Sequence, residues 1–164
     1  GTITTALKQQ KADPQDVAEA VRWMSRLNNH AADLALEAGA HGCTDITGFG
    51  FLGHAYEMAS SGNVRFVIEM AKMPFLPCSD KYAKAFIFPG GAWDNQHFYT
   101  PHVSFAESIN EVDRMRLFDP QTSGGLLFAV DENKVEALLQ HAERINQPAW
   151  LVGHVTEGSG ISVI

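Results

Sequence analysis

A carboxylate and several glycines lie close together in residues 43–54, CTDITGFGFLGH, and these residue types can bind a phosphorylated ligand. The expected order of strand, glycine loop and helix lets backbone N–H groups approach a phosphate. Magnesium at phosphate sites is typically held by one or two protein carboxylates together with phosphate oxygens and water. Asp45, at the end of the expected strand, is therefore a candidate magnesium ligand.

The same segment allows two other interpretations. The spacing Gly48-x-Gly50-x-x-Gly53 matches the dinucleotide-binding fingerprint, and Glu69 lies near the position expected for a ribose-binding acid. In that arrangement, however, the Asp45 carboxylate would lie close to the pyrophosphate and would need an intervening cation. Alternatively, Asp45 caps the turn that follows it. The residues favour the metal site and leave the other two interpretations open.

A second segment, residues 118–127 with the sequence FDPQTSGGLL, combines small hydroxyl residues with paired glycines. Such residues expose backbone N–H groups, which can form a concave anion-binding nest just before a strand. Asp-Pro and Ser-Gly are also common turn dipeptides. Composition alone therefore supports an anion site and an ordinary turn equally.

Taken together, the two segments closely resemble the signature segments of selenophosphate synthetases, which are also called selenide, water dikinases. Two long segments in the right order are far more specific than a triplet of glycines. The resemblance extends over most of the chain and is weakest between residues 93 and 113. It also includes residues 1–6, Met24, Asn28, residues 89–91 and Asn95.

This resemblance implies an architecture shared with aminoimidazole ribonucleotide synthetase and an enzyme that converts ATP, selenide and water into selenophosphate, AMP and orthophosphate. In that family, the Asp of the first segment is a Mg²⁺ ligand contributed by the C-terminal domain, and it maps onto Asp45. The resemblance further implies a surface that faces the nucleotide. Its residues would be Thr44, Thr47, Gly48, Gly50, Thr122, Ser123, Gly124 and Gly125.

Under this resemblance, residues 1–164 are a single C-terminal domain, and the reactive Cys or selenocysteine belongs to an N-terminal half. We therefore expect the isolated chain to be inactive. Its expected partners are that N-terminal half and, in the full-length protein, a second copy in a homodimer. Two alternatives remain open: a non-catalytic module that binds a nucleotide or a partner protein, and a domain of another ATP-dependent enzyme of the same superfamily.

Composition excludes several classes of function. The chain has 164 residues, of which 45% are hydrophobic, enough for one domain with a full core. Its 12 Lys and Arg against 19 Asp and Glu give a net charge of -7, which disfavours nucleic acid and anionic membranes as partners. No apolar run is long enough to span a membrane, and no signal peptide is recognisable. We expect a soluble, cytoplasmic protein.

The cysteines and histidines show no pattern of a metal site. Only Cys43 and Cys78 are present, so neither a disulfide framework nor a zinc site is predicted. A cysteine within a strand is more often a small buried apolar residue than a nucleophile, and we expect this of Cys43. The histidines, among them His54, have no paired ligand spacing and are expected to have structural or surface roles.

The elements that must position the two segments follow from hydrophobic periodicity and turn residues. Residues 89–101 show no hydrophobic periodicity and are predicted to form a long loop. The last two strands are predicted to pair as a hairpin. Strands mixed with helices indicate an α+β or layered α/β fold, with a mixed sheet covered by helices. The predicted strands are 2–7, 43–46, 64–68, 125–130, 150–155 and 161–164, and the predicted helices are 14–27, 31–38, 51–60, 79–86, 111–117 and 132–145.

Overall fold

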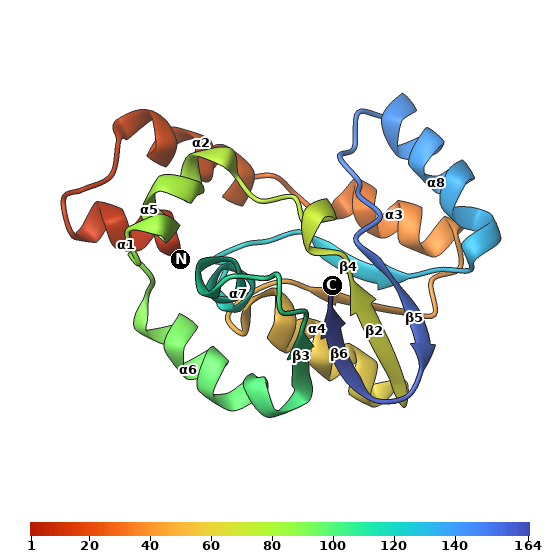
Figure 1. The fold of residues 1–164 in the computed structure, drawn as a ribbon. Coiled ribbons are helices and arrows are strands. Elements are labelled where there is room, and N and C mark those ends of the chain that lie inside the picture. Colours follow the sequence, from red (N-terminus) through yellow and green to blue (C-terminus); the bar gives the residue numbers. More distant parts are fainter.

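Helices and strands are interspersed along the whole chain in the computed structural model, which describes residues 1–164 (Figure 1). No helix combines the length and the apolar composition that crossing a membrane requires. Short 3₁₀ turns occur at Met70–Lys72, Pro77–Ser79 and Thr100–His102. The other elements are α1 (Thr2–Lys8), α2 (Pro14–Met24), α3 (Asn29–Glu37), β1 (Gly42–Asp45), α4 (Gly50–Ser61), β2 (Val64–Ile68), α5 (Asp80–Lys84), α6 (Gly90–Tyr99), β3 (Val103–Phe105), α7 (Glu111–Phe118), β4 (Leu126–Ala129), α8 (Glu132–Arg144), β5 (Gly153–Glu157) and β6 (Gly160–Val163).

The strands form two separate sheets (Figure 1). The smaller sheet is the antiparallel pair β1–β4, in which Gly42 lies opposite Ala129 and Asp45 lies opposite Leu126. The larger sheet has the order β3-β6-β2-β5; β2 is antiparallel to β5 and parallel to β6, and β6 is parallel to β3. This mixed pairing, together with the helices around it, confirms the predicted fold class.

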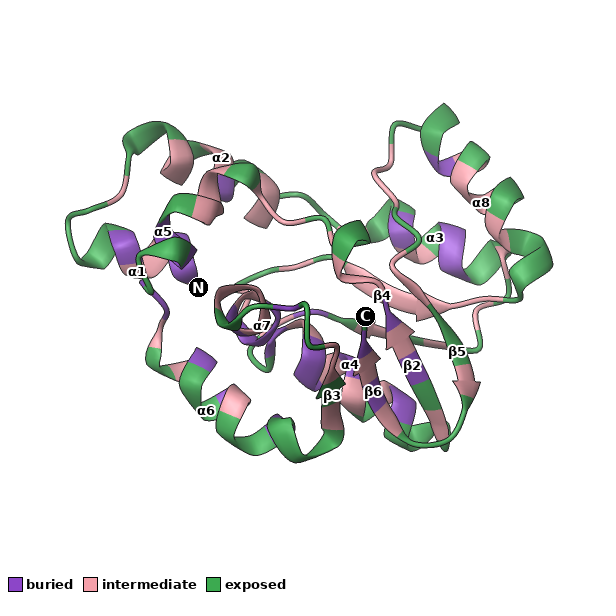
Figure 2. Cartoon of the chain, viewed as in Figure 1, coloured by how far each residue is buried: buried purple, intermediate pink, exposed green.

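The main hydrophobic core lies where α4 packs on the larger sheet and on α7. Leu52, Ala55 and Ala59 recur at helical spacing on α4, and all three are fully buried. They pack with residues of β2, β6 and α7, including Phe66 and Phe118. Figure 2 marks buried residues of α4 in purple, beside the strands β6 and β2. The core therefore fixes the start of α4, which follows the first glycine-rich segment.

The predicted hairpin of the last two strands is wrong, because β2 lies between them. Val64 of β2 lies opposite Glu157 of β5, and Arg65 lies opposite Gly160 of β6. The chain does turn tightly between these strands, with φ of +127° at Gly158. The physical reason for the insertion of β2 between β5 and β6 is that a central strand can pair its backbone N–H and C=O groups along both edges.

The first predicted strand, residues 2–7, is instead the helix α1. Its β-branched residues favour a strand locally, but Ile3 and Ala6 are buried at helical spacing in a second hydrophobic cluster. Tyr82 of α5 contributes to the same cluster. The N-terminal end of this helix is also hydrogen-bonded to a residue distant in sequence, since the backbone N–H of Thr2 donates to the Asp119 carboxylate at 3.0 Å. Tertiary contacts therefore override the local preference.

The predicted loop over residues 89–101 is also wrong, because most of it forms α6. Its buried residues Ala92, Asn95 and Tyr99 recur at helical spacing. One of these three is polar, and Gly90 and Gly91 are poor helix formers. The inward face of α6 therefore does not show in the hydrophobic pattern.

Candidate functional site

The two glycine-rich segments lie side by side where β1 ends and β4 begins. Their pairing continues beyond Asp45 and Leu126 at the edge of the ladder. The N–H of Ile46 donates to the carbonyl of Gly125 at 2.9 Å, and the N–H of Gly124 donates back to Ile46 at 3.0 Å. A side chain on Gly124 would collide with the carbonyl of Ile46. The two segments thus form one continuous surface.

Further hydrogen bonds join the two loops beyond this pairing. The N–H of Gln121 donates to the carbonyl of Thr47 at 2.9 Å. The side-chain amide of Asn28 donates to the carbonyl of Gly124 at 2.9 Å. Of the residues predicted to face a nucleotide, Gly48, Thr122, Ser123 and Gly125 are exposed, Thr44, Thr47 and Gly124 are half-buried, and Gly50 is buried.

Asp45 is exposed at the end of β1, beside these loops. Its carboxylate accepts no hydrogen bond and forms no ion pair, although it directly precedes the turn at residues 46–50. The geometry therefore gives no support to the turn-cap interpretation of Asp45. No group of three or more His, Cys, Asp or Glu side chains in the structure could hold a metal ion. A carboxylate that is free and exposed could serve a magnesium ion as one ligand among several.

The dinucleotide interpretation of the glycine triplet is wrong. That fingerprint requires two parallel strands of one sheet joined by the helix. Here β1 and β2, the strands on either side of α4, belong to different sheets. Gly53 lies inside α4, where an added Cβ would come within 2.6 Å of the Tyr99 ring. This glycine therefore serves helix packing.

His54 organises the turn after Asp45. Its Nε2 accepts a hydrogen bond from the N–H of Phe49 at 3.3 Å and lies 3.1 Å from Oγ1 of Thr47. Burial lowers the pKa of His54, and the negative charges of Asp45 and Glu57 oppose this shift less strongly. The neutral imidazole fits the geometry, because a protonated Nε2 could not accept the hydrogen bond from Phe49. The expected structural role of His54 is thus observed.

This environment makes folding stability depend on pH. Because the pKa of His54 in the folded chain lies below its ordinary value of 6.5, the unfolded chain binds more protons in that interval. The contribution of neutral His54 is therefore complete above about pH 6.5 and is lost as the pH falls toward the folded-state pKa. Urea unfolding at pH 7.5 and 5.5 checks this: the wild-type chain should lose more stability on acidification than His54→Gln. Equal losses would contradict the assignment.

Cys43 lies on the exposed face of β1, two residues before Asp45, which corrects the expectation that it is buried. The reason is that β1 belongs to a two-stranded sheet, in which Cys43 and Asp45 share the more exposed face. Partial desolvation raises the pKa of the Cys43 thiol, and the negative charge of Asp45 raises it further. The thiol therefore stays protonated near neutral pH, as expected for an unreactive cysteine.

Asp119 has a role that the sequence interpretation missed. It is buried, and its Oδ2 accepts a hydrogen bond from the N–H of Thr2 at 3.0 Å. A carboxylate at the start of a helix satisfies N–H groups that lack partners within the helix. The second glycine-rich segment therefore also anchors α1. The Asp-Pro pair gave no signal of this, because α1 was expected to be a strand.

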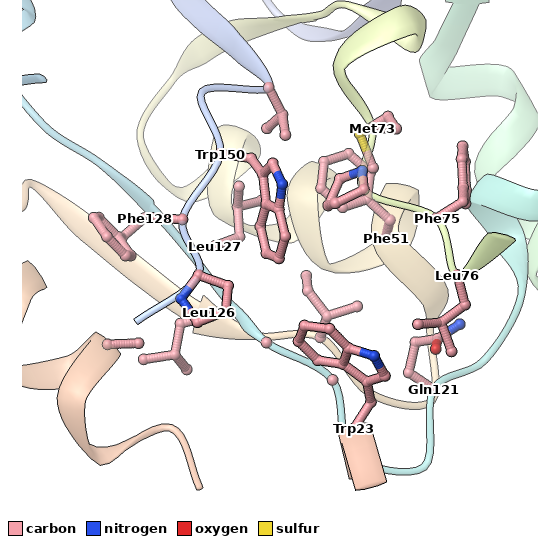
Figure 3. A pocket seen from close by; sticks show the side chains of 18 of the residues that line it. Trp23, Phe51, Met73, Phe75, Leu76, Gln121, Leu126, Leu127, Phe128 and Trp150 are labelled. Carbon is pink, nitrogen blue, oxygen red and sulfur yellow. The ribbon is translucent and has the colours of Figure 1, made fainter. Parts of the chain in front are cut away.

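A cavity of about 1380 Å³ is lined in part by residues 121–127 of the second segment. Figure 3 shows its mostly apolar lining, with the indole rings of Trp23 and Trp150 facing the same space. The centroids of these rings are 6.4 Å apart. Gln121 lies at one end of the cavity, whereas Asp45 is not part of its lining. The cavity therefore includes residues 122–125 of the surface predicted to face a nucleotide but does not include Asp45.

Comparison with known proteins identifies relatives along nearly the whole chain. This chain is 39% identical over 165 residues to a protein named selenide, water dikinase from Citrifermentans bemidjiense. The aligned region covers 100% of this chain and 47% of that relative. A protein of the same name from Caldanaerobacter subterraneus is 38% identical over 158 residues, with coverage of 96% and 46%. The chain thus spans about half the length of these curated relatives.

Solved structures show the same fold at low sequence identity. A thiamine-monophosphate kinase from Stenotrophomonas maltophilia is similar over 99% of this chain and 46% of its own, with a TM-score of 0.62 and 18% identity. Residues 2–164 match the family described as AIR synthase related protein, C-terminal domain. The match covers all the elements described above and agrees with the mixed α/β architecture. The chain therefore belongs to the AIR synthase related family, of which it is a C-terminal domain.

Proposed function

We propose that residues 1–164 are the C-terminal domain of a selenide, water dikinase, an enzyme that makes selenophosphate, AMP and orthophosphate from selenide, ATP and water. The observation that carries this proposal is the free, exposed carboxylate of Asp45 beside two joined glycine-rich loops. The names of the relatives, which are 38–39% identical to this chain, support the same activity.

In this proposal, Asp45 supplies one ligand to a magnesium ion, whose charge offsets that of the triphosphate as phosphoryl groups leave. The exposed residues Gly48, Thr122, Ser123 and Gly125, with the adjoining Thr44 and Thr47, would form the wall that faces ATP. Gly50 and Gly124 would shape that wall through the close backbone approaches at both positions. The chain thus contributes one ligand and a surface.

The remaining ligands and the reactive group would come from a preceding half of the same protein. This accounts for the coverage of only 47% of the Citrifermentans relative. We further propose that the full-length protein is cytoplasmic, since the free cysteines Cys43 and Cys78 suit a reducing compartment. The resemblance to selenophosphate synthetases is the basis for proposing that it also forms a homodimer.

The test is an anaerobic assay of the full-length protein with Mg²⁺, ATP and selenide, followed by ³¹P nuclear magnetic resonance. We expect selenophosphate, AMP and orthophosphate from the full-length protein and none of them from residues 1–164 alone. Omission of selenide is the control. ATP consumption that yields no selenophosphate would point to another ATP-dependent enzyme of the family, and the absence of any turnover would favour a non-catalytic module.

A further inference from the structure

Asn95 is a buried polar residue that contacts both glycine-rich segments at once. It lies on α6 with 7% of its surface exposed. Its side-chain Nδ2 donates to the carbonyl of Gly48 at 3.0 Å and to the carbonyl of Phe118 at 3.0 Å. Gly48 follows Asp45 by three residues, and Phe118 directly precedes the second loop. One amide group therefore spans the two loops.

These two hydrogen bonds have no substitute in the structure. An amide nitrogen carries two N–H donors, and here each donor has a different carbonyl. No other side chain and no turn or loop N–H donates to either carbonyl. A buried carbonyl that loses its donor destabilises its surroundings, and this applies to Phe118, which is 1% exposed. Asn95 therefore adds a side-chain link to the backbone hydrogen bonds that join residues 46–47 to residues 121–125.

The place of Asn95 in the fold makes this link rigid. Its neighbours on the inward face of α6, Ala92 and Tyr99, are both buried. Tyr99 lies close to Gly53 of α4, where an added Cβ would come within 2.6 Å of the tyrosine ring. The helix that carries the amide is thus packed against the helix that follows the Asp45 loop.

We propose that Asn95 is a positioning residue for the candidate metal ligand. By holding Gly48 and Phe118 at a fixed separation, it acts together with the backbone hydrogen bonds between the two loops to fix the position of Asp45 relative to residues 122–125. This inference rests on the proposed function, because it assigns Asn95 to the same magnesium site. Residues that orient metal ligands from outside the coordination sphere commonly change metal affinity or activity by about 10- to 100-fold when replaced.

The experiment compares full-length wild type with Asn95→Ala and with Asp94→Ala, an exposed neighbour on the same helix. Turnover is measured as a function of Mg²⁺ concentration at fixed ATP and selenide. We expect Asn95→Ala to raise the half-saturating Mg²⁺ concentration by about 10-fold or more and Asp94→Ala to leave it unchanged. Loss of folding alone would lower the amount of active protein without changing this concentration.

Hydrogen–deuterium exchange of the same full-length variants gives a readout that does not depend on activity. Amides in residues 46–50 and 118–125 should exchange faster in Asn95→Ala than in wild type or Asp94→Ala. If Asn95→Ala does not fold, Asn95→Gln replaces it in the experiment, because glutamine keeps the amide on a side chain that is one methylene group longer. This variant should show the same two changes to a smaller degree.

Two outcomes separate this inference from the proposed function. Wild-type Mg²⁺ dependence and wild-type exchange in the folded Asn95 variant would overturn the positioning role, even if Asp45→Asn abolishes turnover. Full turnover of Asp45→Asn would instead overturn the proposed metal site. Faster exchange with unchanged Mg²⁺ dependence would show that Asn95 holds the loops without positioning Asp45, which also rejects the inference.

Discussion

Replacement of Asp45 by asparagine in the full-length protein is expected to lower the rate of selenide-dependent ATP turnover by about 10²–10³-fold. Asparagine preserves the shape of the side chain but removes the negative charge with which a carboxylate binds Mg²⁺. The free energy of unfolding should change by less than about 0.5 kcal/mol, because the Asp45 carboxylate is exposed and makes no hydrogen bond or ion pair. The measurements are steady-state kinetics and urea unfolding.

The matched control for this substitution is Asp33→Asn, which removes another exposed negative charge, on α3. It should leave both turnover and stability near the wild-type values. If turnover of Asp45→Asn stays within about 2-fold of wild type, the assignment of Asp45 as a metal ligand is wrong. A large loss of stability in Asp45→Asn would instead favour a structural role for Asp45, such as the turn cap that the structure does not support.

Gly50→Ala is expected to destabilise the chain by about 2–5 kcal/mol. Gly50 has φ of +67°, a conformation that costs an L-residue with a side chain about 1–2 kcal/mol. An added Cβ would also lie 2.7 Å from the backbone carbon and oxygen of Phe118, and backbone atoms cannot move aside cheaply. The start of α4 would have to move away from the end of α7. Urea unfolding of wild type and variant measures the loss.

Gly48→Ala is the control in the same loop. Its φ is not positive, and no atom lies within 4 Å of the position where its Cβ would be. We expect its free energy of unfolding to remain within about 0.5 kcal/mol of wild type. Equal stability of the two variants would mean that the contact between α4 and α7 at Gly50 is looser than the structure shows.

The sequence by itself determined the elements whose residues carry a clear period or a capping residue. The helix predicted to begin at residue 14 does begin there, and the Asp13 side chain accepts a hydrogen bond from the N–H of Gln15 at 2.9 Å at that helix end. The apolar alternation of residues 64–68 predicted β2 with the bounds observed. The two glycine-rich segments were sufficient to indicate the family, and Asp45 could be singled out from its residue type and its place at the end of a strand. These signals are local, so no contact with distant parts of the chain was needed to detect them.

Only the tertiary structure decided how these pieces come together. The helical state of residues 2–8 depends on a hydrogen bond from Thr2 to Asp119, which is 117 residues away in the chain. The helix α6 depends on burial of a face that includes Asn95, a polar residue with partners far from it in sequence. The central place of β2 likewise separates two strands that the sequence alone would pair. In each case, the burial or pairing of a distant backbone group outweighs the local preference of the chain, and a single sequence carries no record of which distant groups will meet.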